Sequence, residues 1–261
     1  MKIFLSKNNK LFLTLFISVI FLSALCIYFT PFWHANDDIG MSMIAHGYGA
    51  VATASPKLIF SNIIWGYFVQ SIPQINGVLG YSIVTLGILV IFGVVILYTL
   101  RELSSLGWFL SITVLAFVST RPILFPQFTL NAGLVTVGAI CCWYLYANKG
   151  SRSALLCGYL LAFIGFLVRS PQFLLILLIA SPLLPWKKMF QDRFAIIAAL
   201  SLLLAIGSAM FADYQAYQGE DWSAFNTLNP VRARFTDFGV GSILKSHSEI
   251  LSQYGYTANG S

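Results

Sequence analysis

Two adjacent carboxylates, Asp37 and Asp38, are the side chains of this chain best suited to chemistry. They follow shortly after the first long apolar run, in a sequence of 261 residues with only nine acidic ones. Such a pair at a membrane surface could hold a divalent cation, Mg²⁺ or Mn²⁺, or accept the proton of an attacking hydroxyl. The pair also follows Asn36, a favoured helix N-cap residue, and acidic residues stabilise a first helical turn. A simple helix start is therefore an open alternative.

Other polar residues near apolar runs extend this candidate site. Arg121 precedes Pro122, and Arg169 precedes Ser170 and Pro171. A guanidinium group matches phosphate oxygens with two parallel hydrogen bonds, although both arginines could instead be interfacial anchors. The candidate substrate-binding residues are Arg121, Arg169, Asn229 and Arg232. His34 and His46 flank the carboxylates, but they lack the spacing of three or four residues that places two ligands on one helix face.

The composition predicts the elements that must position these residues. The chain is 58% hydrophobic and 9% charged, with mean hydropathy +0.80, which indicates an integral membrane protein. Apolar runs near the 20 residues needed to cross a bilayer predict an all-α, polytopic transmembrane helix bundle of about seven spans. The predicted spans are 11–29, 78–100, 105–120, 123–146, 153–168, 171–186 and 194–211. The four cysteines fall in apolar runs and predict neither a disulfide nor a metal site.

The loop after the first span has a composition of its own. Leu58 to Ile72 is short for a span and contains Asn62 and Gln70, and it carries Trp65, Tyr67 and Phe68 before Pro73. It predicts a helix lying in the headgroup zone. We therefore expect residues 1–211 to form the bundle, with outer-loop helices within 30–77. Residues 212–261 are expected to begin an external C-terminal segment, incomplete in this chain.

Lysine and arginine positions predict the orientation of the bundle. With a cytoplasmic N-terminus, nine basic residues lie on the inner side, against three in the short outer loops. The nine are Lys2, Lys7, Lys10, Arg101, Lys149, Arg152, Lys187, Lys188 and Arg193. The expected location is the inner (cytoplasmic) membrane, with the C-terminal tail periplasmic or extracellular. The net charge of +6 then reflects topology and gives no support to nucleic-acid binding.

Two short motifs resemble a known class of enzymes. They are Asn36-Asp37-Asp38-Ile39-Gly40-Met41 with Ala45-His46-Gly47-Tyr48, and Asn229-Pro230-Val231-Arg232-Ala233-Arg234 with Asp237. With the layout of residues 1–245, they resemble the GT-C class of membrane glycosyltransferases, of the bacterial surface-polysaccharide type.

The resemblance implies a transferase that moves a sugar from a polyprenyl-phosphate donor to a cell-envelope glycan or lipid on the outer face. It implies that Asp37 and Asp38 act at the reaction centre, as base or metal ligand, and that Arg121 and Arg169 meet the lipid phosphate. Members of this class usually have more spans and a folded external domain. A transporter or flippase, and a non-catalytic membrane subunit or truncated pseudo-enzyme, are the alternatives.

Overall fold

The computed structural model describes residues 7–34, 36–49, 51, 53–103 and 107–218. The helices, in chain order, are α1 (Lys7–Tyr28), α2 (Asn36–His46), α3 (Ile63–Ser71), α4 (Gly80–Leu103), α5 (Trp108–Leu124), α6 (Phe128–Lys149), α7 (Arg152–Val168), α8 (Ser170–Ala180), the 3₁₀ turn η1 (Ser181–Leu183), α9 (Trp186–Gln191) and α10 (Arg193–Tyr217). The described residues contain no strand, and Ile75 and Val78 form an isolated bridge. The predicted all-α bundle is confirmed.

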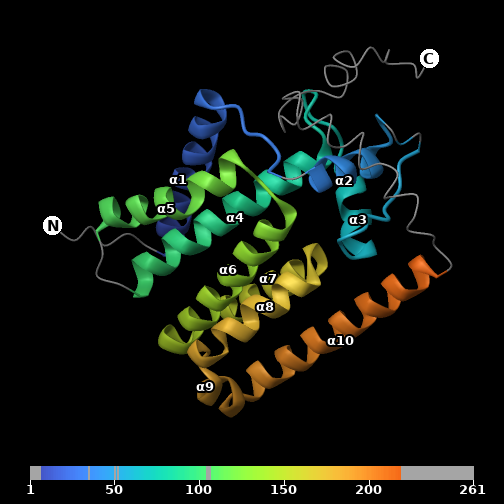
Figure 1. The fold of residues 1–261 in the computed structure, drawn as a ribbon. Helices are drawn as coiled ribbons and strands as arrows, with labels where there is room; N and C mark the ends of the chain where they lie inside the picture. The colour runs from blue at the N-terminus through green and yellow to red at the C-terminus, as the bar shows by residue number, and fades with distance from the viewer. Residues whose placement is uncertain (1–6, 35, 50, 52, 104–106, 219–261) are drawn as a thin grey trace.

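The long helices run alternately between two ends of the bundle (Figure 1). We call them the α2–α3 end and the α9 end. Interactions between helix termini define both ends. At the α2–α3 end the contacts are Asp38 to Phe128, His46 to Tyr81, Ser61 to Val168 and Asp213 to Ile63. At the α9 end they are Lys10 to Glu102, Arg101 to Trp108, Tyr146 to Asp192 and Arg152 to Phe194.

Each predicted span contains most or all of one helix, but these helices differ in length. Four helices of the described chain, α1, α4, α6 and α10, are long and apolar enough to cross a membrane. The helices α5 and α7 have 17 residues each and α8 has 11, so the structure supports a multi-pass bundle and leaves the count of seven as a prediction. The predicted loop helix is present as α3 but covers only Ile63–Ser71.

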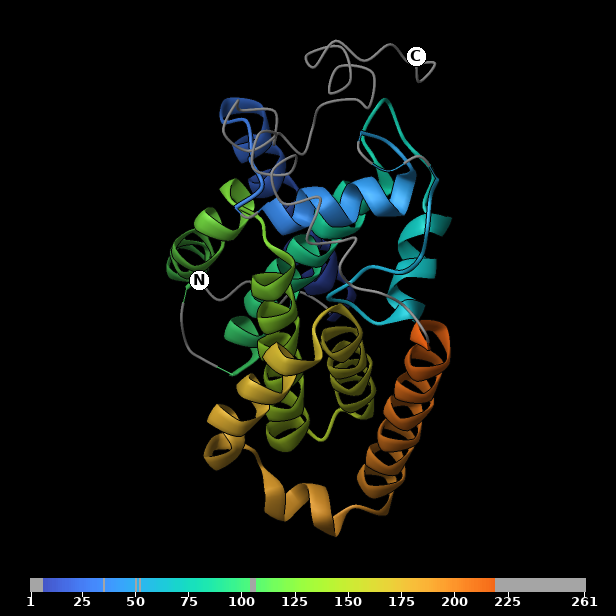
Figure 2. The same ribbon diagram turned by 45° about the vertical axis from the view of Figure 1, so that its right-hand side comes forward.

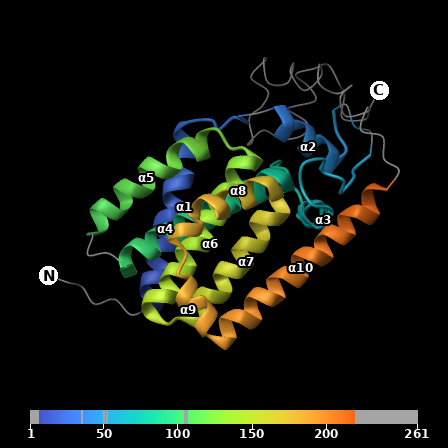
Figure 3. The same cartoon turned by 60° about the horizontal axis from the view of Figure 1, so that its bottom comes forward.

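The helices α6 and α7 form the closest contact of the bundle and lie at its centre, with α10 on one flank and α1, α4 and α5 on the other (Figure 3). Two glycines of α7 permit this approach. A Cβ atom on Gly158 would lie 2.7 Å from the Trp143 ring, and one on Gly165 would lie 2.5 Å from Oγ1 of Thr136. Small residues are the usual means by which membrane helices approach closely. This packing fixes the position of the α7 C-terminus.

Candidate functional site

The Asp38 carboxylate is buried at the α2–α3 end, where it caps α6 and not α2, the helix that contains it. Its side chain is 0% exposed. Its Oδ1 accepts hydrogen bonds, both 3.0 Å long, from the Phe128 backbone N–H and from the Tyr81 hydroxyl. Phe128 is the first residue of α6, whose N-cap residue Gln127 makes no side-chain capping bond. Asp38 therefore supplies the acceptor that the first turn of α6 lacks.

Burial also determines the protonation of this group. Removal from water raises the pKa of the Asp38 carboxyl to about 8, and the nearby Asp37 carboxylate adds to the rise. The hydrogen bonds from Tyr81 and Phe128 oppose it. The second oxygen, Oδ2, is buried without a hydrogen-bond partner among the described residues. A proton on this oxygen lowers the cost of burying the group.

A second residue of α2 caps another long helix in the same way. His46 Nε2 accepts a 3.0 Å hydrogen bond from the backbone N–H of Tyr81, in the first turn of α4. The helix α2 thus satisfies the N-termini of α4 and α6 with side chains from its two ends. The predicted helix start at Asn36 is confirmed, because α2 begins there with Asp37 and Asp38 in its first turn.

Asp37, unlike its neighbour, is partly exposed. Its charge acts on Arg169: burial lowers the pKa of the Arg169 guanidinium, and the Asp37 carboxylate opposes that change. The Arg169 Cζ atom lies 4.8 Å from the centroid of the Phe60 ring and 5.0 Å from that of Phe128. These rings stack on each other with centroids 5.6 Å apart. The charges of Asp37 and Arg169 therefore interact, and their joint role at a reaction centre stays a prediction.

The loop before α3 holds the end of α7, and with it Arg169. The Ser61 hydroxyl donates to the Val168 carbonyl at 2.8 Å, and the Asn62 backbone N–H donates to the Leu167 carbonyl at 2.9 Å. Carbonyls in the last turn of a helix have no partner within it. Their capture by this loop ends α7 at Val168 and directs the following Arg169 into extended backbone, with φ −160°.

The loop also fixes the end of α10. Asn62 caps α3, accepting from the Ile64 N–H, and its amide donates to the Ala209 carbonyl at 2.9 Å. Asp213 Oδ1 accepts from the Ile63 N–H at 2.8 Å. The first turn of α3 is therefore satisfied by its own N-cap and by α10. These hydrogen bonds attach α10 to Asn62 and Ile63 at the α2–α3 end.

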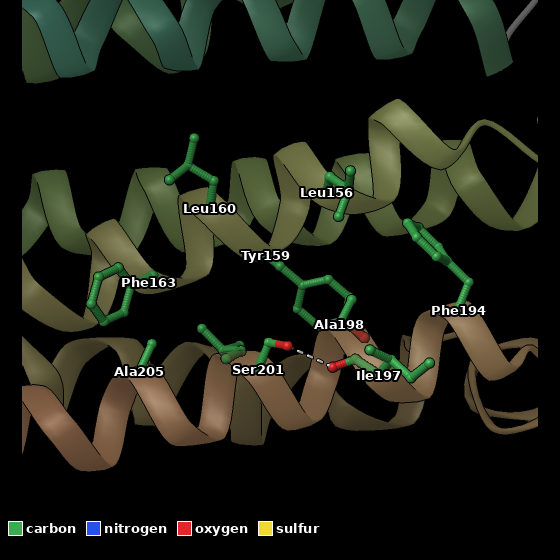
Figure 4. A pocket seen from close by; sticks show the side chains of 10 residues that line it. Leu156, Tyr159, Leu160, Phe163, Phe194, Ile197, Ala198, Ser201 and Ala205 are labelled. Carbon is green, nitrogen blue, oxygen red and sulfur yellow. Dashed lines mark hydrogen bonds between the residues drawn. The ribbon is translucent and has the colours of Figure 1, made fainter.

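Between these attachments lies a groove of about 770 Å³, bounded by α7 and α8 on one side and α10 on the other. Its walls are largely aliphatic and aromatic. Its polar residues come from the α2–α3 end and are Ser61, Asn62, Arg169, Ser170, Asp213, Tyr214 and Tyr217. A second cavity of about 340 Å³ (Figure 4) continues the same seam toward the α9 end. Leu202 lines both cavities. Figure 2 shows α10 standing along this flank of the bundle.

The other candidate residues do not join this site. Arg121 is exposed in the last turn of α5 and is not among the residues that line the groove. Asn229 and Arg232 lie outside the described residues. The described residues hold no group of three or more His, Cys, Asp or Glu side chains able to bind a metal. His46 Nε2 is occupied by the Tyr81 N–H, and the Asp38 carboxylate is fully buried.

Sequence reasoning did not identify several residues that complete the site. Tyr81 and Phe60 lie among apolar residues and have no local signal of a polar role. Asp213 could have been found, because it is the only acid close to the end of the last apolar run. No family model, curated protein or solved structure gives a significant match to this chain. The function must therefore be inferred from the site itself.

Proposed function

We propose that this protein is a membrane glycosyltransferase that moves a sugar from a polyprenyl-phosphate donor to a hydroxyl of a cell-envelope glycan or lipid. The observation that carries the proposal is the apolar groove with Arg169, on which the Asp37 charge acts, at its α2–α3 end. A polyprenyl phosphate has the matching form, because it is a long apolar chain ending in an anion. Other amphiphiles share that form, so the sugar-transfer step is tested separately below.

The groove would bind the donor by two different interactions. The polyprenyl chain would lie against the apolar walls that α8 and α10 contribute, with Phe173, Leu174 and Ile206 among them. The phosphate would meet the Arg169 guanidinium, which presents several fixed N–H donors to its oxygens. Partial burial of Arg169 strengthens that attraction, because fewer waters compete for the phosphate.

In the reaction the acceptor hydroxyl oxygen attacks the anomeric carbon of the donor sugar. A new C–O bond forms, the bond from that carbon to the phosphate oxygen breaks, and the configuration inverts. Asp37 takes the hydroxyl proton. Arg169 stabilises the electron pair that leaves with the polyprenyl phosphate. Asp38 is a positioning residue in this scheme, because it is fully buried and occupied by two donors.

A divalent cation does not enter this scheme. Both carboxylates were predicted as ligands, but the Asp38 side chain has no exposed surface and its Oδ1 is already bonded. Asp37 alone would give a cation one protein carboxylate. The residues described here do not fit a preformed Mg²⁺ or Mn²⁺ site, so no step is assigned to one.

We further propose seven spans, with the α9 end cytoplasmic and the groove opening toward the periplasmic or extracellular side. The alternating helix directions support an odd number of crossings between α1 and α10. Eight of the nine basic residues expected inside fall within the described helices and turns, all at the α9 end: Lys7, Lys10, Arg101, Lys149, Arg152, Lys187, Lys188 and Arg193. That bias matches the positive-inside preference.

Substitution of the two proposed reacting residues tests the activity. Cells that lack the native gene would produce the full chain, Asp37→Asn or Arg169→Gln, and the sugar content of their envelope glycans would be measured by mass spectrometry. We expect either variant to lower transfer about 100-fold or more, the usual contribution of a catalytic acid or base. Immunoblots of membrane fractions check that insertion and abundance are unchanged.

Arg193→Gln is the matched control, because it removes one guanidinium from an exposed position at the α9 end. It should leave the glycan unchanged. An unaltered glycan in Asp37→Asn would contradict the role of that carboxylate. Substrate flux that survives both substitutions without sugar transfer would favour a transporter instead.

Donor binding is measured separately on the purified chain. Native mass spectrometry with a synthetic polyprenyl phosphate should show a complex that Arg169→Gln weakens, whereas the matching polyprenol should bind weakly to both proteins. Equal binding of the phosphate and the alcohol would remove Arg169 from the proposal.

A further inference from the structure

A second pair of cavities lies at the α9 end, on the side of α7 away from α10. The first has a volume of about 480 Å³ and is almost entirely apolar, with walls from α1, α4, α6 and α7. The second, of about 350 Å³, is lined by Lys10, Glu102 and Lys149 as well as by less polar residues. The two share Tyr98, Leu145 and Ser151, so they adjoin. Together they form an apolar pocket with a charged mouth.

The mouth carries an excess of positive charge. Lys10 forms an ion pair with Glu102 at 2.7 Å, which leaves the Lys149 ammonium as the net charge of the three groups. Ser151, which lines both cavities, is the N-cap of α7. The first turn of that helix therefore adds its partial positive charge to the same place. An anion is the ligand that this mouth complements.

We propose that these cavities form a binding site for an anionic phospholipid. One acyl chain would occupy the apolar cavity, whose volume falls within the roughly 300–1,000 Å³ typical of ligand pockets. The phosphate would lie in the mouth near Lys149 and the first turn of α7. Basic pockets between membrane helices are a known way to hold anionic headgroups. This site is separate from the donor groove, and its existence does not depend on sugar transfer.

The full chain, purified in a mild detergent, allows a direct test by native mass spectrometry. Dioleoyl phosphatidylglycerol should bind more tightly than dioleoyl phosphatidylcholine, which has the same chains and no net charge. Lys149→Gln should weaken phosphatidylglycerol binding about fivefold, the effect expected for one surface lysine. Lys149 is exposed at the end of α6, so the substitution should not affect folding. Lys187→Gln, an equally exposed lysine at the same end, is the matched control and should change binding little.

A second measurement examines the apolar cavity. Cys157 is exposed and lines it, whereas Cys142, also in its wall, is buried. Phosphatidylglycerol should slow the alkylation of Cys157 by N-ethylmaleimide, as followed by peptide mass spectrometry, and should do so less in Lys149→Gln. Equal affinities for the two lipids, equal effects of the two lysine substitutions, or alkylation of Cys157 that lipid does not slow would overturn the proposal.

Discussion

The two faces of α7 differ in how they meet their neighbours. Toward α6, Gly158 and Gly165 bring the helices so close that a methyl group at either position would clash. Toward α10, the same helix borders cavities of about 340 and 770 Å³. One face is packed as a protein core, and the other leaves room for a ligand.

The packed face and the open face of α7 therefore contribute to the site in different ways. The packed face fixes the end of α7, and Arg169 follows that end directly. The open face places this fixed guanidinium at the mouth of an apolar groove. A side chain that binds a ligand is positioned most precisely when a rigid element holds it. A long apolar ligand, in contrast, needs space that closely packed helices do not provide.

The largest effect is expected from filling the packed face. Gly165→Val would place a Cβ atom 2.5 Å from Thr136 Oγ1 and 3.3 Å from the Ala132 carbonyl oxygen. We expect a loss of about 1–3 kcal/mol or more, measured as the thermal unfolding of the purified protein. Gly138→Ala is the control in the same contact, because its Cβ would lie 3.6 Å from Leu161, an ordinary contact distance. Equal stability of the two variants would mean that the face is not closely packed.

Per pH unit a smaller effect, at most about 1.4 kcal/mol, should follow the titration of Asp38, which holds the first turn of α6 in place. Its pKa is about 8 in the folded protein and about 3.9 when unfolded, so between these values only the folded state holds the proton. Stability should therefore fall as the pH rises from about 4 to about 8, and then level off. Asp38→Asn cannot titrate and should flatten this part of the profile. Unfolding curves of both proteins measured over that range check the sign.

The smallest effect is expected on the open face. Ile206→Phe adds volume to a side chain that lines the groove between α7 and α10. Because the groove has room for the larger ring, stability should change by less than about 1 kcal/mol, below the usual cost of overpacking a core. Binding of the polyprenyl phosphate should nevertheless weaken, because the ring occupies its place. A loss of stability as large as that of Gly165→Val would show that α10 packs as tightly as α6.

Much of the helix layout could be predicted from the sequence. Every apolar run predicted as a span contains most or all of one helix, because a membrane leaves the backbone no polar partners except its own. The lengths of the helices were predicted less well. The run 171–186 contains α8, a 3₁₀ turn and the start of α9, because Pro182 and Pro185 lack the N–H that a continuous helix needs. The loop helix is shorter than Leu58 to Ile72 because Asn62 caps it one residue before Ile63.

The roles of the two aspartates could not be separated in the sequence. They are adjacent, of one type, and in the first turn of one helix. A turn of about 100° per residue is enough to bury Asp38 between α4 and α6 and leave Asp37 partly exposed. Which side of α2 faces the bundle depends on helices that begin more than forty residues later in the chain.

The sequence by itself determined the all-helical class and the apolar segments, because the backbone needs internal hydrogen bonds in a membrane. It also determined the segregation of basic residues and the presence of Asp37 and Arg169, because these depend on local composition. Only the tertiary structure decided that Asp38 and His46 cap other helices, and that α7 is packed on one face and open on the other. Those features depend on distances between segments far apart in the chain, which the order of residues along one helix does not contain.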